Sequence, residues 1–460
     1  MGPVSGCATA GPVTSGRWLP VPGDDPMEGP ISIQAAGQQF GQTRRQPDIL
    51  AFFDNAFDWF FYVYVFATIA LPGGSFYGFN FKSPMFLGLL PLSVYSLFHR
   101  KQATPTEIAL AIAVPAILTG WVVLGLSNGF ALSGVMRQYM DILITVLICW
   151  LATIFCNNDE TRRIKFLRLI LNAVLAAAVL KIAVIAYAVI RGIPVVQMVQ
   201  LLDKIFDTEL MTMDLGDLFG RVQFVSDGLI PVCVFILLRH RDRLKIGNAL
   251  ASLMILLLLI SVTFSFSRFF WGFTAFAFIV GLALGKRDRF QLSVIVVLSL
   301  SFLAALPALV SVYQLRFSTA VAGGSDELRT EQVPPLLRFF TSAPFFGHGM
   351  GSYTNEDVRG ETEAGRAAYE VQLLSVPAQI GLLGTSLFLI LGFYYYDHLW
   401  WKSPLKWSDR IGITLLLAFW VAAGLTNPLL FHPLSGINYA ALATLATLRS
   451  KKNATLTPST

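Results

Sequence analysis

The residues best suited to chemistry lie in a polar interval, residues 314–370, that separates long apolar runs. One histidine, His348, lies within this interval, which ends at the carboxylate of Glu370. Its arginines are Arg316, Arg329, Arg338, Arg359 and Arg366. An imidazole or a carboxylate can take a proton from a hydroxyl group, and guanidinium groups bind phosphate or carboxylate through paired donors. The interval therefore predicts an anion-binding site beside a candidate general base.

The segment 344–353 carries glycine at every second position around His348, in Gly347, Gly349 and Gly351. Glycine lets a backbone approach a ligand closely and point amide donors at it. The pattern predicts a backbone loop that contacts the ligand, and a tight structural turn is the alternative. His348 could equally form a structural hydrogen bond, and Glu370 could cap the apolar helix that begins beside it.

Two more arginines stand at the ends of apolar runs, Arg221 in the segment 220–224 and Arg268 in the segment 265–268. Few acidic residues lie near either of them in the sequence. A charge at the end of an apolar helix is costly unless it is paired or functional. Arg329 and Arg338 differ, because acids in the same interval could pair with them, namely Asp326, Glu327, Glu331 and Glu361.

The composition places the chain in a membrane. Hydrophobic residues make up 55% of its 460 residues, charged residues 13%, and the mean hydropathy is +0.62. Soluble domains carry about 25% charged residues. Residues 1–47 lack an apolar core and are rich in Gly, Pro, Ser and Gln, which predicts a disordered N-terminal tail. The expected fold class is therefore an all-α integral membrane protein.

A membrane-spanning helix needs about 20 mostly apolar residues. The sequence predicts twelve such spans, at residues 51–71, 83–98, 107–126, 138–156, 166–190, 222–238, 247–265, 269–285, 290–313, 371–396, 409–425 and 433–448. The segment 194–217 mixes apolar residues with Asp203, Lys204 and Asp207, and it predicts an amphipathic helix on the membrane surface. Lys181 and Asp227 are charges within predicted spans, and the sequence assigns no partner to either.

Basic residues orient these spans, because cytoplasmic loops are rich in Lys and Arg. The basic clusters alternate so that both termini lie on the cytoplasmic side. Residues 48–313 then hold spans one to nine, 314–370 a large outer loop, 371–448 the last three spans, and 449–460 a cytoplasmic tail. The outer basic residues are arginine except Lys82 and Lys204. Because arginine keeps its charge when partly desolvated, this choice predicts an anion bound at the outer surface.

Several common motifs are absent from the sequence: it contains no P-loop, no Rossmann glycine pattern, no HExxH and no outer Asp-x-Asp. We therefore expect no cofactor, no metal and no nucleic-acid partner. The energy for any reaction should come from an activated substrate.

The segments 220–224 (GRVQF), 265–268 (SFSR) and 344–351 (PFFGHGMG) together resemble the O-antigen ligase and polymerase superfamily of bacterial envelopes. The resemblance covers roughly residues 215–390. Gly381 and Thr385 match the second half of the ligase signature, and counting back places Glu370 where that family has a histidine. The resemblance implies a GT-C-like architecture in the bacterial inner membrane, with the large loop in the periplasm.

The implied reaction is an inverting, metal-independent glycosyl transfer at the periplasmic face. The donor would be an undecaprenyl diphosphate-linked glycan, and the acceptor a lipid A-core or a second lipid-linked glycan, both held among membrane lipids. Arg221 and Arg268 would hold the diphosphate, with Arg338 and Arg329 as helpers. Glu370 or His348 would be the base.

Three functions remain open at this point. The spacing of Gly381 and Thr385 favours O-antigen ligation onto the lipid A-core, whereas the carboxylate at Glu370 favours polymerisation of repeat units. A twelve-helix transporter or flippase is the third alternative. Transporters are commonly built from repeated halves with charges in the middle of their helices, and this sequence shows no matching halves and collects its charges at one surface.

Overall fold

The computed structural model describes residues 49–71, 75–76, 79–80, 82–100, 105–206, 211–214, 220–285, 288–296, 299–300, 310, 319–357 and 363–448. The tails expected at 1–47 and 449–460, and most of the ninth predicted span, 290–313, lie outside these residues.

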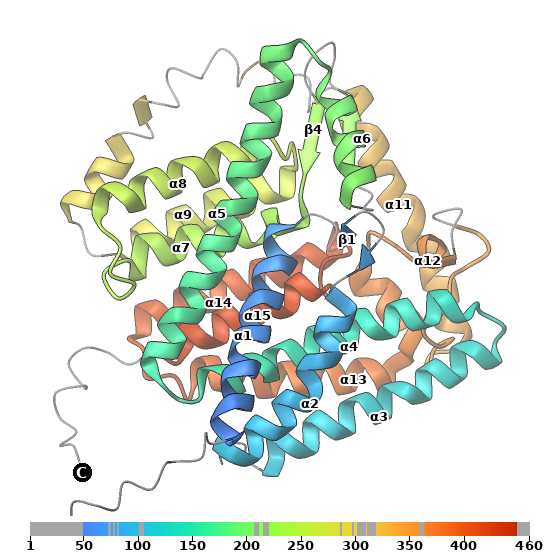
Figure 1. Cartoon of the computed structure of the whole chain (residues 1–460). Coiled ribbons are helices and arrows are strands. Elements are labelled where there is room, and N and C mark those ends of the chain that lie inside the picture. Colours follow the sequence, from blue (N-terminus) through green and yellow to red (C-terminus); the bar gives the residue numbers. More distant parts are fainter. Residues whose placement is uncertain are drawn as a thin grey trace, which may run out of the picture. The chain divides into compact units, whose positions relative to one another are not determined.

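The described chain is almost entirely helical (Figure 1). Its helices are α1 (Ile49–Ala70), α2 (Lys82–Arg100), α3 (Pro105–Ser127), α4 (Leu132–Cys156), α5 (Glu160–Arg191), α6 (Val195–Phe206), η1 (Val225–Leu229), α7 (Ile230–His240), α8 (Asn248–Thr263), α9 (Arg268–Ala283), α11 (Thr319–Ser342), α12 (Glu363–Arg366), α13 (Gln372–Trp400), α14 (Trp407–Ala422), η2 (Ala423–Leu425) and α15 (Pro433–Ala446). Two short antiparallel hairpins join β1 (Ser75–Phe76) to β2 (Phe79–Asn80), and β3 (Met211–Asp214) to β4 (Gly220–Gln223).

Five of the described helical segments are long and apolar enough to cross a membrane. They are α3, α4, α5, α13, and α14 continued by η2. Helices α8 and α9 are apolar but contain only 16 residues each. The all-α class expected from the composition is therefore confirmed, together with several candidate spans.

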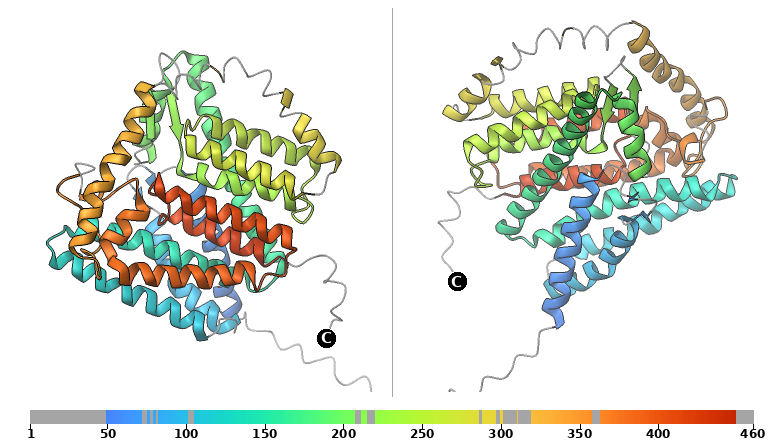
Figure 2. Two further views of the ribbon diagram at one scale, coloured as in Figure 1. Left: turned by 180° about the vertical axis from the view of Figure 1, so that it is seen from behind. Right: turned by 45° about the horizontal axis from the view of Figure 1, so that its top comes forward.

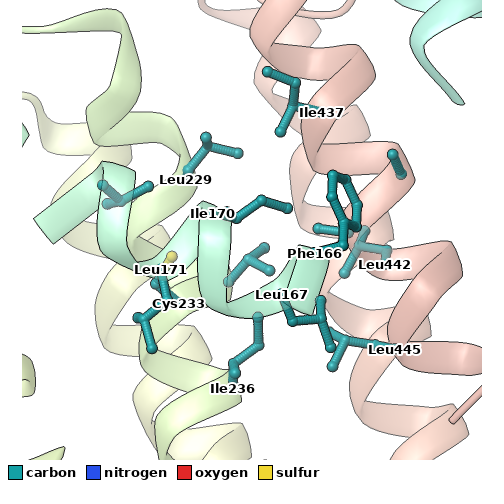
Figure 3. Packing of buried hydrophobic residues seen from close by; sticks show 14 of the residues in the cluster. Phe166, Leu167, Ile170, Leu171, Leu229, Cys233, Ile236, Ile437, Leu442 and Leu445 are labelled. Carbon is teal, nitrogen blue, oxygen red and sulfur yellow. The ribbon is translucent and has the colours of Figure 1, made fainter. Parts of the chain in front are cut away.

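The core lies where α5, α7 and α15 meet (Figure 3). Every residue of α7 from Ile230 to Leu238 is buried, which marks a helix enclosed on all sides. The side chains that interlock there are Phe166, Leu167, Ile170 and Leu171 of α5, Leu229, Cys233 and Ile236 of η1 and α7, and Ile437, Leu442 and Leu445 of α15. This packing fixes the segments next to α7 that carry candidate site residues.

The sixth predicted span, 222–238, is not one helix. The chain enters as strand β4, turns through η1, and only then forms α7, which has 11 residues. The side chain of Asp227 explains the break, because its Oδ2 accepts from the Phe224 amide at 3.0 Å. Side chains that bind nearby backbone amides compete with regular helix.

The segment 194–217 also differs from the expected single amphipathic helix. Helix α6 ends at Phe206, and residues 211–214 form β3. The apolar face of α6, which includes Val199 and Leu202, packs in one cluster with residues of α5 and β4. The amphipathic pattern therefore reflects packing of α6 against the rest of the protein. A 3.6-residue period alone cannot distinguish such packing from contact with a membrane surface.

The large loop contains a helix of its own, α11, of 24 residues, which keeps Pro334 and Pro335 inside it. Helix α11 contacts α13, and both views in Figure 2 show it at the edge of the bundle. Helix α13 is broken at Gly381, where φ is 66° and ψ is −174°. This break lies in a helix that is otherwise long enough to span a membrane.

Candidate active site

Strand β4 brings Arg221 to the turn that precedes α9. The Val222 amide donates to the Phe264 carbonyl at 3.1 Å, and Arg221 Nε donates to the Ser265 carbonyl at 3.2 Å. Arg221 also donates to the Oε1 atom of Gln223. The structure thus places Arg221 against the segment that ends at Arg268. The two arginines predicted to act together lie on adjacent segments although they are distant in sequence.

Arg268 is the first residue of α9. Ser267 caps the helix by accepting from the Phe270 amide, and the preceding Phe266 has a positive φ of 46°. The N-terminus of a helix carries a partial positive charge from its unpaired amides. Arg268 adds a full charge at the same place, so this end of α9 is suited to an anion.

The charges Lys181 and Asp227 pair with each other. Lys181 Nζ lies 2.7 Å from Asp227 Oδ1, and the two side chains are 0% and 3% exposed. The ammonium group also donates to the Val222 carbonyl at 3.4 Å. Because Asp227 holds the Phe224 amide as well, the pair fixes the backbone of β4 that presents Arg221. A buried pair offsets its desolvation only when its geometry is good and its remaining groups are bonded, as here.

Replacing Lys181 with methionine is expected to destabilise the protein by about 3–5 kcal/mol, because Asp227 is left buried and uncompensated. The double variant Lys181→Met, Asp227→Asn removes both charges and keeps an acceptor for the Phe224 amide. We expect it to recover most of the lost stability. Thermal unfolding in detergent measures both. A single variant as stable as the native protein would contradict the role of the pair.

Glu370 lies beside Arg329 at the start of α13. Arg329 Nε donates to Glu370 Oε2 at 2.8 Å, and the side chains are 23% and 28% exposed. Gln332 of α11, fully buried, accepts from the Glu370 amide at 3.0 Å. Arg329, expected as a helper for the diphosphate, therefore holds the candidate base. The carboxylate is oriented and remains partly open to solvent.

His348 is fixed by its neighbours. Its ring stacks on Phe339 with centroids 3.8 Å apart and planes at 8°. Its Nε2 lies 2.9 Å from the Phe339 carbonyl and 2.9 Å from Ser342 Oγ. A carbonyl only accepts, so Nε2 carries the proton and donates to it. This arrangement favours the structural role that was the alternative for His348.

Arg338 pairs with Glu356 at the surface. Its Nε donates to Glu356 Oε2 at 3.2 Å, and the side chains are 61% and 52% exposed. The hydrogen bond from Arg338 lowers the pKa of the Glu356 carboxyl below its usual value. Glu356 was not among the partners expected for Arg338. A diphosphate would have to displace Glu356 before Arg338 could assist it.

The glycine segment meets the break in α13. Gly349 donates to the Gln379 carbonyl at 2.8 Å, and Leu382 and Leu383 donate to the carbonyls of Pro344 and Phe345 at 2.8 and 3.0 Å. These bonds satisfy backbone groups that the break at Gly381 frees. Non-helical backbone within a membrane-spanning helix is tolerated only where such partners exist. The glycine segment 344–353 and Gly381, which the sequence presents as separate motifs, thus pack against each other.

In this structure the amides of these glycines are bonded within the protein, which favours the tight structural turn that was the alternative to a ligand loop. The amides of Gly347, Gly349 and Gly351 donate to the Ala343 carbonyl, the Gln379 carbonyl and Gln138 Oε1. All three residues have a positive φ, of 70°, 93° and 71°. The close approach that requires glycine is to helices α3, α4 and α13.

Gly349→Ala is expected to destabilise the protein more than Gly129→Ala, by about 1–3 kcal/mol. Both glycines have a positive φ, so each variant carries similar backbone strain. A Cβ at Gly349 would overlap the backbone of Gly125, whereas at Gly129 it would meet open space. Thermal unfolding of the two variants isolates the cost of the overlap. Equal unfolding temperatures would show that the close approach of Gly349 to Gly125 does not require glycine.

An apolar cavity of about 970 Å³ runs along α13. Its lining on this helix begins at Gln372, two residues beyond Glu370, and ends at Leu399. Its other walls come from α3, α4, α14 and α15, through residues that include Val114, Thr145, Leu417 and Tyr439. The cavity could hold a long apolar chain whose polar end lies near Glu370.

A comparison with known protein families matches the part of the chain that contains most of the candidate site residues. Residues 253–389 match the O-antigen ligase family. The match confirms the resemblance that the sequence motifs indicated. It contains Arg268, the glycine segment, Arg329, Glu370 and the break in α13, whereas Arg221 and Lys181 lie before it. No match was found among curated proteins.

Three glutamines position the site in this O-antigen ligase-like region, and the sequence motifs did not single them out. Gln332 holds the start of α13, as described above. Gln138 bonds Gln379, and Gln379 Nε2 donates to the Ser352 carbonyl at 2.8 Å. An amide side chain within an apolar run is the signal that could have found Gln379, because polar groups at membrane depth need partners.

Proposed function

We propose that the protein is a glycosyltransferase that moves a polysaccharide, the O-antigen, from undecaprenyl diphosphate to a hydroxyl of a lipid A-core acceptor. The reaction would take place at the periplasmic face of the bacterial inner membrane. One observation carries the proposal: Arg221 on β4 bonds the turn that precedes Arg268, the first residue of α9, and Arg268 lies within the region that matches the O-antigen ligase family.

In the proposed step, the acceptor oxygen attacks the anomeric carbon of the donor sugar. The bond from that carbon to the phosphate oxygen breaks, and undecaprenyl diphosphate leaves with the electron pair. Direct attack inverts the anomeric centre. Arg221 and Arg268 stabilise the charge that develops on the diphosphate, because donors arranged in advance act most strongly where charge appears in the transition state.

Glu370 takes the proton of the acceptor hydroxyl. Its bond to Arg329 orients the carboxylate, and the Gln332 side chain holds the backbone from which it projects. His348 supports the loop instead. The preference for Glu370 as the base rests on the hydrogen bond that already occupies Nε2 of His348.

The lipid of the donor would lie in the apolar cavity. Its lining begins at Gln372 near Glu370 and continues along α13, so a diphosphate at the outer end could leave its chain among apolar side chains. In this arrangement the chain has twelve spans in a GT-C-like architecture, with both termini cytoplasmic. The five long apolar helices support a protein that crosses the membrane several times.

Polymerisation of repeat units is the second candidate, favoured by the carboxylate of Glu370 at the position where the ligases have a histidine. The chemical step is the same, and only the acceptor changes to a second lipid-linked glycan. Both reactions belong to the assembly of lipopolysaccharide.

Product identity tests the proposal directly. Purified protein in liposomes is given the lipid-linked glycan with lipid A-core, or the lipid-linked glycan alone, without nucleotide or metal. Glycan attached to lipid A-core supports ligation, and longer lipid-linked chains support polymerisation. If neither product forms and the glycan only crosses the bilayer, the transferase proposal fails in favour of a transporter.

A further inference from the structure

A second, polar hollow lies between the α3–α4 turn and the loop that follows α11. Its volume is about 460 Å³, and its lining residues include Asn128, Phe130, Phe339, Tyr353, Asn355 and Glu356. Arg329 and Glu370 are not part of its lining. The proposed chemistry therefore leaves this hollow without a role.

The aromatic rings of the hollow are held in place. Phe130 and Tyr353 meet edge to face with centroids 5.4 Å apart, and the Tyr353 hydroxyl accepts from Arg366 at 3.0 Å. Phe339 is stacked on His348. Rings that are fixed before binding lose little conformational entropy when a ligand arrives.

Polar groups surround these rings. Asn128, Asn355 and Glu356 are exposed at the rim, and the Glu356 carboxylate is held by Arg338. Binding sites use apolar and aromatic side chains for contact area and a few polar groups for orientation. A sugar ring offers C–H faces that pack on aromatic rings and hydroxyls that need both donors and acceptors. Lipid tails lack such hydroxyls, so a polar rim does not suit them.

Helix α11 connects the hollow to the proposed catalytic centre. Arg329 contacts Glu370, whereas Phe339, ten residues later in the same helix, lines the hollow. At the helical rise this separation is about 15 Å. A short oligosaccharide spans that distance, and a single sugar does not.

We propose that this hollow, formed by Asn128, Phe130, Phe339, Tyr353, Asn355 and Glu356, is an oligosaccharide subsite that holds a glycan segment a few units away from the reacting hydroxyl or anomeric carbon. The catalytic connection rests on the proposed function, whereas the binding of sugar does not. The glycan comes either from the donor or from the acceptor, and the experiment separates these sources.

The test uses Asn355→Trp, which fills the hollow from an exposed position, with Thr341→Trp, exposed on α11 outside the lining, as the matched control. Two probes are titrated by calorimetry into the full-length protein in nanodiscs: the lipid-free oligosaccharides cleaved from the donor and from the acceptor used in the transfer assay. We expect one probe to bind, and Asn355→Trp to weaken its binding at least tenfold while Thr341→Trp leaves it unchanged.

In transfer assays, the KM for the substrate that supplies the bound glycan should rise by the same factor, with kcat near the native value. Failure of both probes to bind the native protein, or equal binding by Asn355→Trp, overturns the subsite. Binding that behaves as expected in a protein that forms no transfer product keeps the subsite and overturns the proposed function.

Discussion

Replacing Arg268 with alanine is expected to lower the rate of glycan transfer by about 100-fold to 1,000-fold, and Arg221→Ala should do the same. Losing one prearranged donor to a developing negative charge has a cost of this size in other enzymes. Arg268 is the first residue of α9, where the helix dipole already favours an anion, and Arg221 on β4 bonds the turn that precedes this helix. The measurement is initial transfer rate in liposomes at saturating donor.

Arg191→Ala is the matched control for these variants. Arg191 is an exposed arginine at the end of α5, where it lies over the Tyr187 ring, so it shares the charge and the position at a helix end. Its removal should leave transfer near the native rate. Arg221→Lys adds a further check, because the lysine ammonium keeps the positive charge but cannot bind the diphosphate bidentately. Transfer at near-native rates in both Arg221→Ala and Arg268→Ala would remove the diphosphate clamp.

Glu370→Gln is expected to reduce kcat by about 100-fold to 10,000-fold, the range that a positioned general base contributes. Glutamine keeps an oxygen that can accept from Arg329, so the geometry at the start of α13 is preserved while the basic carboxylate is lost. Steady-state kinetics with both substrates saturating measure the effect.

His348→Ala provides the comparison for that variant. Its ring supports Phe339 and Ser342, so we expect lower stability and a transfer rate within tenfold of native. If His348→Ala abolishes transfer in protein that is fully folded and Glu370→Gln does not, the base has been assigned to the wrong residue. If neither variant loses activity, the mechanism needs no side-chain base at these positions.

Helix boundaries show how much of the fold the sequence predicts. Predicted spans 107–126 and 138–156 lie within α3 (Pro105–Ser127) and α4 (Leu132–Cys156), because an uninterrupted apolar run leaves few alternatives to helix. The prediction of one helix at 222–238 was wrong for a local reason that a hydropathy pattern does not show. There the Asp227 side chain captures a backbone amide and bonds Lys181, so the helix starts only at Ile230.

The candidate site was only partly readable from residue types. Arg221 and Arg268 were predicted because charges at the ends of apolar runs are costly and therefore informative. Glu370 was predicted because its carboxylate ends the polar interval beside an apolar helix. The groups that surround these residues could not be predicted from the sequence. The glycines looked like a ligand loop because a positive φ and a close approach are all that glycine signals. Whether the approaching group is a ligand or another helix depends on what packs there.

By itself the sequence determined the class of the protein, the location of several of its helices and the family it resembles, because hydropathy, charge and motif spacing are properties of contiguous residues. Only the tertiary structure decided which groups meet. Lys181 pairs with Asp227 across 46 positions, and Arg329 with Glu370 across 41. Such pairs form where helix packing brings side chains within bonding distance, and no local pattern in the chain encodes that distance.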